Sequence, residues 1–180
     1  ISTDGENIFL AGTTPNSILG TNMGYHDTFW IKTSLNGGTL IAKQWGDENF
    51  NIFQSSCFGA GGVFVGEGGS TPDLLGYITN KVSYLDPTTG DKVWEKTLAG
   101  AGVQAEGAAC DGEGNAYLVF GSTVYKFDSL GNQIWANSSG ADVQSNDGIA
   151  VKNGKVIVGR GTYGTAEIRM IEASTGDSVN

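Results

Sequence analysis

One strand–turn–strand pattern recurs four times along this 180-residue chain. Its copies are residues 84–94 (YLDPTTGDKVW), 125–135 (YKFDSLGNQIW), 170–179 (MIEASTGDSV) and, more loosely, 29–41 (FWIKTSLNGGTLI). The turn glycines Gly90, Gly131 and Gly176 lie 41 and 45 residues apart. A period of this length, built only from short strands, is typical of the blades of a β-propeller.

Each repeat is expected to hold four short strands, because β-branched and aromatic runs alternate with glycine-rich turns. The sequence therefore predicts an all-β fold, a β-propeller of four-stranded antiparallel blades, as a single domain. About four blades are expected, in repeats at approximately 1–53, 54–106, 107–147 and 148–180. The first repeat is expected to lack its first strand and the fourth its last. We therefore expect a part of a larger ring, since about six to eight blades are typical.

Composition limits the classes of partner. The net charge is −9 with only 10 Lys and Arg residues, which argues against binding to nucleic acid or to an anionic membrane surface. No apolar run reaches the length of a membrane-spanning helix, so no membrane insertion is expected. An acidic chain rich in Gly, Ser, Thr and Asn is common among secreted and surface proteins, and we predict a secreted or extracellular location.

The two cysteines, Cys57 and Cys110, fall at equivalent places in successive repeats. Two interpretations stay open. They are two buried small apolar residues, or they form a disulfide between neighbouring repeats.

The residues in the turns predict the backbone geometry of those turns. Gly90 and its counterparts stand where φ must be positive, and the acids Asp86, Asp128 and Glu172 are expected to accept backbone N–H bonds in their hairpins. The glycine-rich run at residues 66–70 is interpreted as a tight turn.

Two motif groups resemble known repeat families. Gly12-Thr13-Thr14 and residues 20–32 (GTNMGYHDTFWIK) resemble the secreted bacterial β-propeller repeat family. The aromatic–Asp–Gly–Trp pattern at residues 85–94 and 127–135 is similar, more loosely, to pyrroloquinoline-quinone-type propeller repeats, in which such a Trp packs against the neighbouring blade. The first repeat departs from this pattern, with Ala42 near the Trp position and Trp45 three residues later. The resemblance implies blade packing and no quinone site, because the acidic metal cluster of that enzyme class is missing from the pattern.

Few residues are candidates for a site. Asp111, Glu113 and Asn115 alternate along a turn, a spacing that can wrap Ca²⁺ with oxygen ligands, although Asp, Gly and Asn also form plain turns unaided. Asn137 begins an N-glycosylation sequon. His26, the only histidine, is expected to be a loop residue rather than a catalyst or a metal ligand. No other cofactor is expected.

Two insertions, at residues 13–27 and 70–80, lengthen the loops between second and third strands, at a rim where propellers commonly place binding residues. Trp45, Trp94 and Trp135 are interpreted as packing residues between blades. The sequence therefore predicts a non-catalytic module of an extracellular assembly or appendage, binding protein partners or copies of itself. The alternative is a carbohydrate-binding or adhesin propeller that holds glycans with the two long loops.

Overall fold

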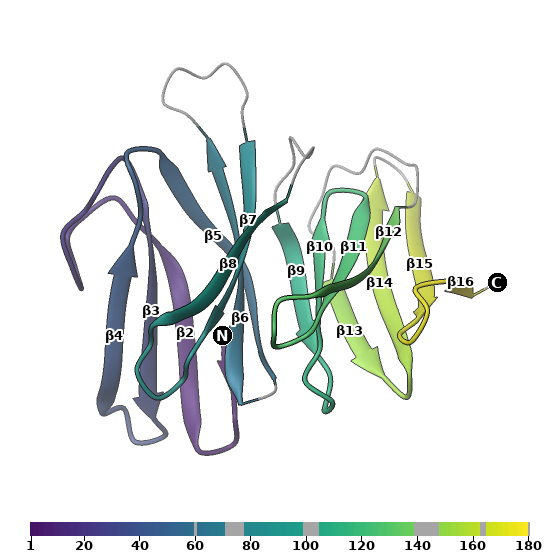
Figure 1. Ribbon diagram of the computed structural model, residues 1–180, viewed down its shortest axis with the longest axis horizontal. Helices are drawn as coiled ribbons and strands as arrows, with labels where there is room; N and C mark the ends of the chain where they lie inside the picture. Colours follow the sequence, from purple (N-terminus) through teal and green to yellow (C-terminus); the bar gives the residue numbers. More distant parts are fainter. Residues whose placement is uncertain (60, 71–77, 99–104, 139–147, 163–164, 180) are drawn as a thin grey trace.

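The computed structural model describes residues 1–59, 61–70, 78–98, 105–138, 148–162 and 165–179. They form four antiparallel sheets of four strands each, in chain order (Figure 1). Blade 1 contains β1 (Ser2–Thr3), β2 (Asn7–Thr14), β3 (Asp27–Ser34) and β4 (Thr39–Trp45). Blade 2 contains β5 (Phe50–Gly59), β6 (Gly62–Ser70), β7 (Ile78–Leu85) and β8 (Lys92–Leu98). The described part of the chain contains no helix that could cross a membrane.

The second half repeats this arrangement. Blade 3 contains β9 (Ala105–Cys110), β10 (Ala116–Phe120), β11 (Thr123–Phe127) and β12 (Gln133–Ser138). Blade 4 contains β13 (Gly148–Lys152), β14 (Lys155–Thr162), β15 (Thr165–Glu172) and β16 (Ser178–Val179). The first strands of blades 2, 3 and 4 contact one another in succession, so they lie innermost. The predicted β-propeller fold is confirmed, and blades 1 and 4 lie at opposite ends of the molecule in Figure 1.

Three expectations about strand limits were wrong. Blade 1 has a first strand and blade 4 has a last one, although β1 and β16 are only two residues long. The repeat boundaries, which the sequence sets only approximately, fall inside β5 and β9 at 53/54 and 106/107. Residues 66–70 belong to β6 rather than to a tight turn, because they pair with residues 50–55 on one side and with residues 78–82 on the other.

Each blade buries one face against the next blade, and we call this its forward face; the opposite face is its rear face. Phe9 and Trp30, on the forward face of blade 1, cluster with Val63, Val65 and Leu85 on the rear face of blade 2. The same arrangement joins blade 2 to blade 3 and blade 3 to blade 4. These side chains alternate along their strands, so each central strand contributes to two interfaces.

The repeated glycine and Trp form one contact between blades. A Cβ at Gly131 would lie 3.1 Å from the Trp94 ring, and one at Gly176 would lie 2.8 Å from the Trp135 ring. Both glycines have positive φ, 85° and 82°, as predicted. Glycine is therefore required twice at each turn, by the backbone conformation and by the Trp of the preceding blade. The predicted packing role of these two tryptophans is confirmed.

In blade 1 the equivalent contact uses another residue. Ile41 and Trp30 approach Gly90, where a Cβ would lie 2.8 Å and 3.0 Å from them. Ile41, rather than Ala42, thus occupies the position of the missing motif Trp, because it follows Gly37 by the same four residues that separate Trp94 from Gly90.

The acids at the turns behave as predicted in two of three cases. Asp86 accepts hydrogen bonds from the backbone N–H groups of Thr88 and Thr89, and Asp128 accepts them from Leu130 and Asn132. Glu172 differs, because its longer side chain forms an ion pair with Lys155 across the β14–β15 pair.

Candidate functional site

The loop between β2 and β3, residues 15–26, stands on the rim of blade 1 and is fastened by two side chains at its base. Gln44 on β4 accepts hydrogen bonds from the backbone N–H groups of Ile18 (3.1 Å) and Leu19 (3.0 Å), and its Nε2 donates to Asp27 at 3.0 Å. Asp27 is fully buried and also accepts from Met23 N. The protein itself supplies all of these contacts, which fasten the loop to β3 and β4.

Two glycines let this loop approach the connection between β4 and β5. A Cβ at Gly24 would lie 2.1 Å from the carbonyl oxygen of Asp47, and a Cβ at Gly46 would lie 2.1 Å from the Asp27 carboxylate. Any side chain at either position would displace backbone or a buried carboxylate. The loop and the connection therefore form one packed unit.

The loop displays large apolar side chains to solvent. Ile18, Met23 and Tyr25 are all exposed, Tyr25 to 54%. The Tyr25 ring stacks on Phe50 at 4.8 Å, and the His26 ring stacks on the same side chain at 5.2 Å. An exposed apolar group on a fastened loop is typical of an interaction site. His26 lies in this loop, as predicted.

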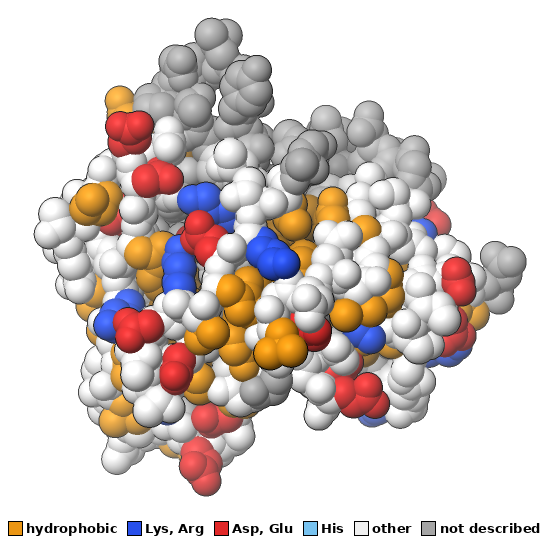
Figure 2. All heavy atoms as spheres, in the orientation of Figure 1, with side chains coloured by type: hydrophobic (Ala, Val, Ile, Leu, Met, Phe, Trp, Pro, Cys, Tyr) orange, Lys and Arg blue, Asp and Glu red, His pale blue; other side chains and the backbone are white. Residues whose placement is uncertain are grey.

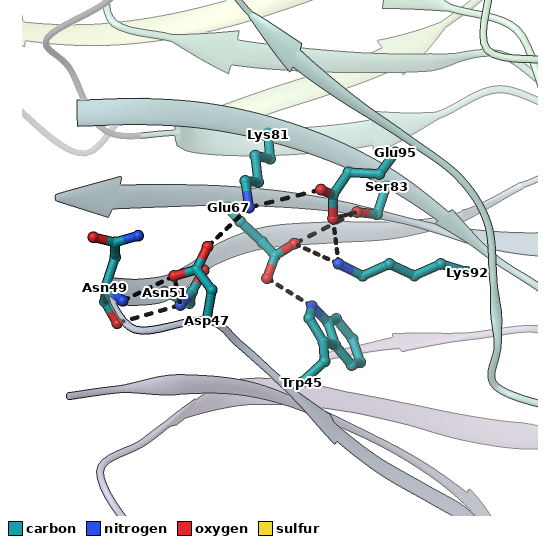
Figure 3. Close-up of polar contacts among 9 residues, drawn as sticks. All are labelled: Trp45, Asp47, Asn49, Asn51, Glu67, Lys81, Ser83, Lys92 and Glu95. Atoms are coloured by element: carbon teal, nitrogen blue, oxygen red, sulfur yellow. Dashed lines mark hydrogen bonds and ion pairs between the residues drawn. The ribbon is translucent and has the colours of Figure 1, made fainter. Parts of the chain in front are cut away.

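Beneath the loop, a buried carboxylate joins blades 1 and 2 (Figure 3). Glu67 on β6 is only 3% exposed. Its Oε1 accepts a hydrogen bond from the Trp45 indole N–H at 2.9 Å, and its Oε2 accepts one from the Ser83 hydroxyl at 3.4 Å. Lys92 Nζ lies 3.8 Å from Oε2 and 5.0 Å from the centre of the Trp45 ring. The predicted packing role of Trp45 is confirmed, with Glu67 as its partner.

Two lysines neutralise the acids around Glu67. Lys81 lies 3.5 Å from Asp47 and 3.6 Å from Glu95, and Lys92 forms a short ion pair with Glu95. Burial acts to raise the pKa of Glu95, but the hydrogen bond from Lys92 and the charges of Lys92 and Lys81 outweigh it, so the pKa lies below its ordinary value.

Asp47 shows the same balance. Burial acts to raise its pKa, whereas hydrogen bonds from Asn51 and Asn49 and the charge of Lys81 lower it below the ordinary value. Figure 2 shows such acidic and basic side chains interspersed on this face, with apolar side chains between them. Since its charges are paired and hydrogen-bonded, the network is suited to supporting the rim.

The predicted calcium ligands lie elsewhere, in the turn between β9 and β10. The Asp111 carboxylate accepts hydrogen bonds from the backbone of Glu113 and Asn115, from the Asn115 amide and from the Tyr117 hydroxyl. Both of its oxygens are thus engaged within the turn. Among the residues that the structure describes, no group of three or more His, Cys, Asp or Glu side chains could hold a metal ion. Calcium binding here stays a prediction.

The same turn borders a cleft of about 660 Å³ between blades 3 and 4. Lys126, buried at its floor, donates to the carbonyl oxygen of Ala173 at 2.8 Å. Lys32 makes the equivalent contact with Pro87 between blades 1 and 2 at 3.0 Å. Because the contact recurs, we assign Lys126 to blade packing.

Asn137, the predicted glycosylation residue, lies on β12 with both ends of its amide engaged. Its Nδ2 donates to the carbonyl oxygen of Gly176, and its Oδ1 accepts from Arg169. A glycan at Nδ2 would displace the first contact. Glycosylation stays a prediction.

Only one of the two predicted long loops lies fully within the described residues. Of the first insertion, residues 15–26 form the fastened rim loop and residues 13, 14 and 27 belong to β2 and β3, whereas residues 71–77 of the second insertion lie outside the described residues. Sequence reasoning missed Asp27, Gln44 and Glu67, the side chains that fasten and support the rim. The available signal was a lone acid, Glu67, within a glycine-rich run between two strands.

Comparison with known proteins supports the fold alone. No family model and no curated protein matches the chain. One similar structure is a protein of unknown function from Bacteroides caccae (11% identity, TM-score 0.55), matched over 86% of this chain and 55% of that one. Others are the glutaminyl cyclase of Myxococcus xanthus (18% identity, TM-score 0.47; 71% of this chain, 49% of that one) and a quinohemoprotein alcohol dehydrogenase of Pseudomonas putida (18%, 0.49; 69% and 19%).

This chain thus spans about half the length, or less, of the proteins it resembles in structure. The likeness extends to propeller-type folds, and membership of the secreted bacterial repeat family stays a prediction.

Proposed function

We propose that this chain is a non-catalytic propeller module that builds an extracellular assembly through contacts between blade faces. The observation that carries the proposal is the exposed forward face of blade 4. Ile157, Ile168 and Met170 are exposed there, at positions that the other blades bury. Exposed apolar sheet faces of this kind associate in water, because association removes their surface from solvent.

The disulfide supports the extracellular part of the proposal. Cys57 and Cys110 are bonded, with a Cα–Cα distance of 5.6 Å, so of the two interpretations of the cysteines the bonded one holds. Disulfides persist in oxidising compartments and are rare in the cytosol. The bond joins the first strands of blades 2 and 3.

Sedimentation velocity over about a hundredfold range of concentration tests the proposal, since self-association follows mass action. We expect species heavier than the 18.7-kDa chain, and we expect Ile168→Asp to abolish them. The control is Ile134→Asp, at an exposed position on the outer strand of blade 3. A single monomeric species at the highest concentration would contradict the proposal.

A second candidate function is glycan binding by the rim loop. The fastened loop presents the Tyr25 ring to solvent, and aromatic rings of this kind offer large contact area at a low cost in conformational entropy. A glycan array probed with the wild type and with Tyr25→Ala tests it. Leu130→Ala, at the exposed tip of another turn, is the control. A signal that is equal in all three proteins, or missing from all three, would eliminate this candidate.

A further inference from the structure

We propose that the cleft between blades 3 and 4 is a binding site for a small ligand with one carboxylate group, which Lys126 holds. The ligand carries a hydroxyl or an ammonium group beside that carboxylate. This site goes beyond the proposed function, because it lies between two neighbouring blades of the chain and does not depend on contacts with another copy or another protein.

The cleft has the size of a small-molecule site. It lies at the end of the sheets that carries the β9–β10 and β13–β14 turns (Figure 1). Its volume, about 660 Å³, falls within the range of about 300–1,000 Å³ that is usual for small ligands. Its walls come from both blades, namely Tyr117, Lys126 and residues 110–113 of blade 3 and residues 151–155 and 172–174 of blade 4.

Lys126 places a buried charge at the floor of this cleft. It is only 8% exposed. Its ammonium group has three hydrogens to donate, and one of them goes to the carbonyl oxygen of Ala173 at 2.8 Å. The ammonium also lies 5.4 Å from the centre of the Tyr117 ring, a cation–π contact. Lys126 forms no ion pair with any residue that the structure describes.

A carboxylate is the group that this ammonium lacks. Burial of a charge costs free energy unless an opposite charge and hydrogen bonds offset the lost hydration. The carbonyl oxygen and the ring face offset only part of this cost, because neither carries a full negative charge. A carboxylate in the cleft would accept a charge-assisted hydrogen bond from Lys126, which is stronger than a bond between neutral groups.

The acids around the cleft are engaged elsewhere or stand at its mouth. Both oxygens of Asp111 accept hydrogen bonds within the turn, one of them from the Tyr117 hydroxyl at 2.8 Å. Glu172 forms an ion pair with Lys155. Glu113 is exposed. A ligand is therefore the remaining source of a carboxylate for the buried ammonium.

The charges of the cleft favour a ligand with a single negative charge. Three lysines and three acids line it: Lys126, Lys152, Lys155, Asp111, Glu113 and Glu172. A phosphate dianion would be repelled by the three carboxylates. Since Glu113 is an acceptor at the mouth, a hydroxyl or an ammonium beside the ligand's carboxylate has a partner there. Hydroxy acids, including sugar acids, and amino acids share this chemistry.

The equivalent lysine of blade 1 separates binding from blade packing. Lys32 pairs with Phe9 across β2 and β3 in the register in which Lys126 pairs with Tyr117 across β10 and β11. It donates to the carbonyl oxygen of Pro87 at 3.0 Å and lies 5.9 Å from the centre of the Phe9 ring. Lys32 is partly exposed, so water reaches its ammonium. The packing contact is common to both lysines, whereas burial distinguishes Lys126.

Chemical-shift mapping of the wild-type backbone amides by NMR tests the site. The probes are two carboxylates (glucuronate and alanine), their neutralised amides (glucuronamide and alaninamide) and inorganic phosphate. We expect saturable shifts at residues 110–113 and 151–155 with one or both carboxylates, with dissociation constants of about 1 mM or lower. The amides and phosphate should bind about tenfold more weakly or worse. The carboxylate that binds identifies the source as a sugar acid or an amino acid.

Lys126→Met, with Lys32→Met as the matched control, separates a ligand contact from blade packing. Met170 holds the same register position in blade 4, so a blade accommodates Met there. The carbonyl oxygen of Ala173 keeps a donor, the Trp135 indole N–H at 3.1 Å. Lys126→Met should raise the dissociation constant about tenfold or more. Lys32→Met, which loses the equivalent packing contact, should bind like wild type.

Four results would overturn the site. They are no saturable shift in the cleft with either carboxylate up to about 20 mM, amides or phosphate that bind as tightly as the carboxylates, Lys126→Met that binds like wild type, and Lys32→Met that weakens binding equally. The comparison of each carboxylate with its amide needs only the wild type, so it decides the matter if Lys126→Met does not fold. Since none of these results concerns self-association, each leaves the proposed assembly function standing.

Discussion

The interface between blades 2 and 3 and the interface between blades 1 and 2 join the same kinds of face by different means. Between blades 2 and 3 the buried cluster extends from the disulfide at the inner strands to Trp94 at the outer strand. Between blades 1 and 2 the apolar cluster gives way to a polar network around Glu67.

The difference shows that the same repeat can form an interface that supplies stability and an interface that fixes the arrangement of its side chains. Apolar burial is non-directional and supplies most of the stability, so it tolerates exchange of similar residues. A buried, hydrogen-bonded carboxylate adds less net stability but accepts one arrangement of partners. We infer that the polar interface fixes the position of the rim loop above it, because Asp47 contacts both the loop at Gly24 and the network at Lys81.

The largest effect is expected from Phe127→Ala, in the apolar interface. Phe127 is fully buried and its ring lies 6.3 Å from that of Trp94 in the preceding blade. The change should lower the free energy of unfolding by about 3–5 kcal/mol, since it removes buried surface and leaves a cavity. Chemical denaturation measures it, and Leu130→Ala on an exposed turn is the control. A loss under about 1 kcal/mol would contradict the assignment of this interface as the main source of stability.

Removal of the disulfide should have the next largest effect. Cys57 and Cys110 are 53 residues apart, so the bond restricts a long loop of the unfolded chain. Cys57→Ala with Cys110→Ala should cost about 2–4 kcal/mol. Reduction of the wild type with a thiol provides an independent measurement. If the double variant were as stable as wild type, the apolar contacts alone would hold blades 2 and 3 together.

A smaller effect is expected in the polar interface. Glu67→Gln keeps an acceptor for the Trp45 indole N–H but loses the charge beside Lys92, and it should cost about 1–3 kcal/mol. Glu95→Gln is the matched control, because that side chain is 32% exposed and its loss should cost less than about 1 kcal/mol. Equal stability of Glu67→Gln and wild type would remove the distinction between the two interfaces.

The sequence predicts this fold well where one local pattern indicates both a turn and a packing contact between neighbouring blades. Asp128 and Gly131 define a hairpin by themselves, and the Trp that follows in the second and third repeats packs on the turn glycine of the next repeat. Regular spacing therefore predicted both the blades and their order. Two-residue strands such as β1 and β16 carry no such pattern, because alternation cannot be read over two positions.

The site was harder to predict because its contacts join distant residues. Gln44 and Ile18 are 26 residues apart, and Trp45 and Glu67 are 22 apart. The loop length marked the rim correctly, but Gln44 belongs to no motif, and Asp27, although it lies in the motif at residues 20–32, gives no sign in the sequence of its contact with Gln44. Glu67 lies among glycines that indicate a turn in isolation, and only pairing with β5 and β7 makes that run a strand.

The smallest effect concerns a polar group in the turn that follows Cys110, beside the apolar cluster between blades 3 and 4 that contains Tyr117. Burial acts to raise the pKa of Asp111, but hydrogen bonds from Asn115, Tyr117 and Glu113 outweigh it and lower the pKa below its ordinary value. The unfolded chain, with an Asp pKa of about 3.9, therefore binds more protons at acidic pH than the folded chain does. The stability from this group is complete above that value and is lost as the pH falls toward the lower, folded pKa.

Asp111→Asn should thus lower stability at neutral pH and flatten its decline below about pH 4. Denaturation curves recorded across that range measure the slope, with Asp177→Asn, on an exposed turn, as the control for loss of one charge. A variant that kept the wild-type acid dependence would show that Asp111 contributes through turn geometry alone. In that case the interface between blades 3 and 4, whose cluster contains Tyr117, would be apolar in its energetics up to its edge, and it too would contrast with the Glu67 network.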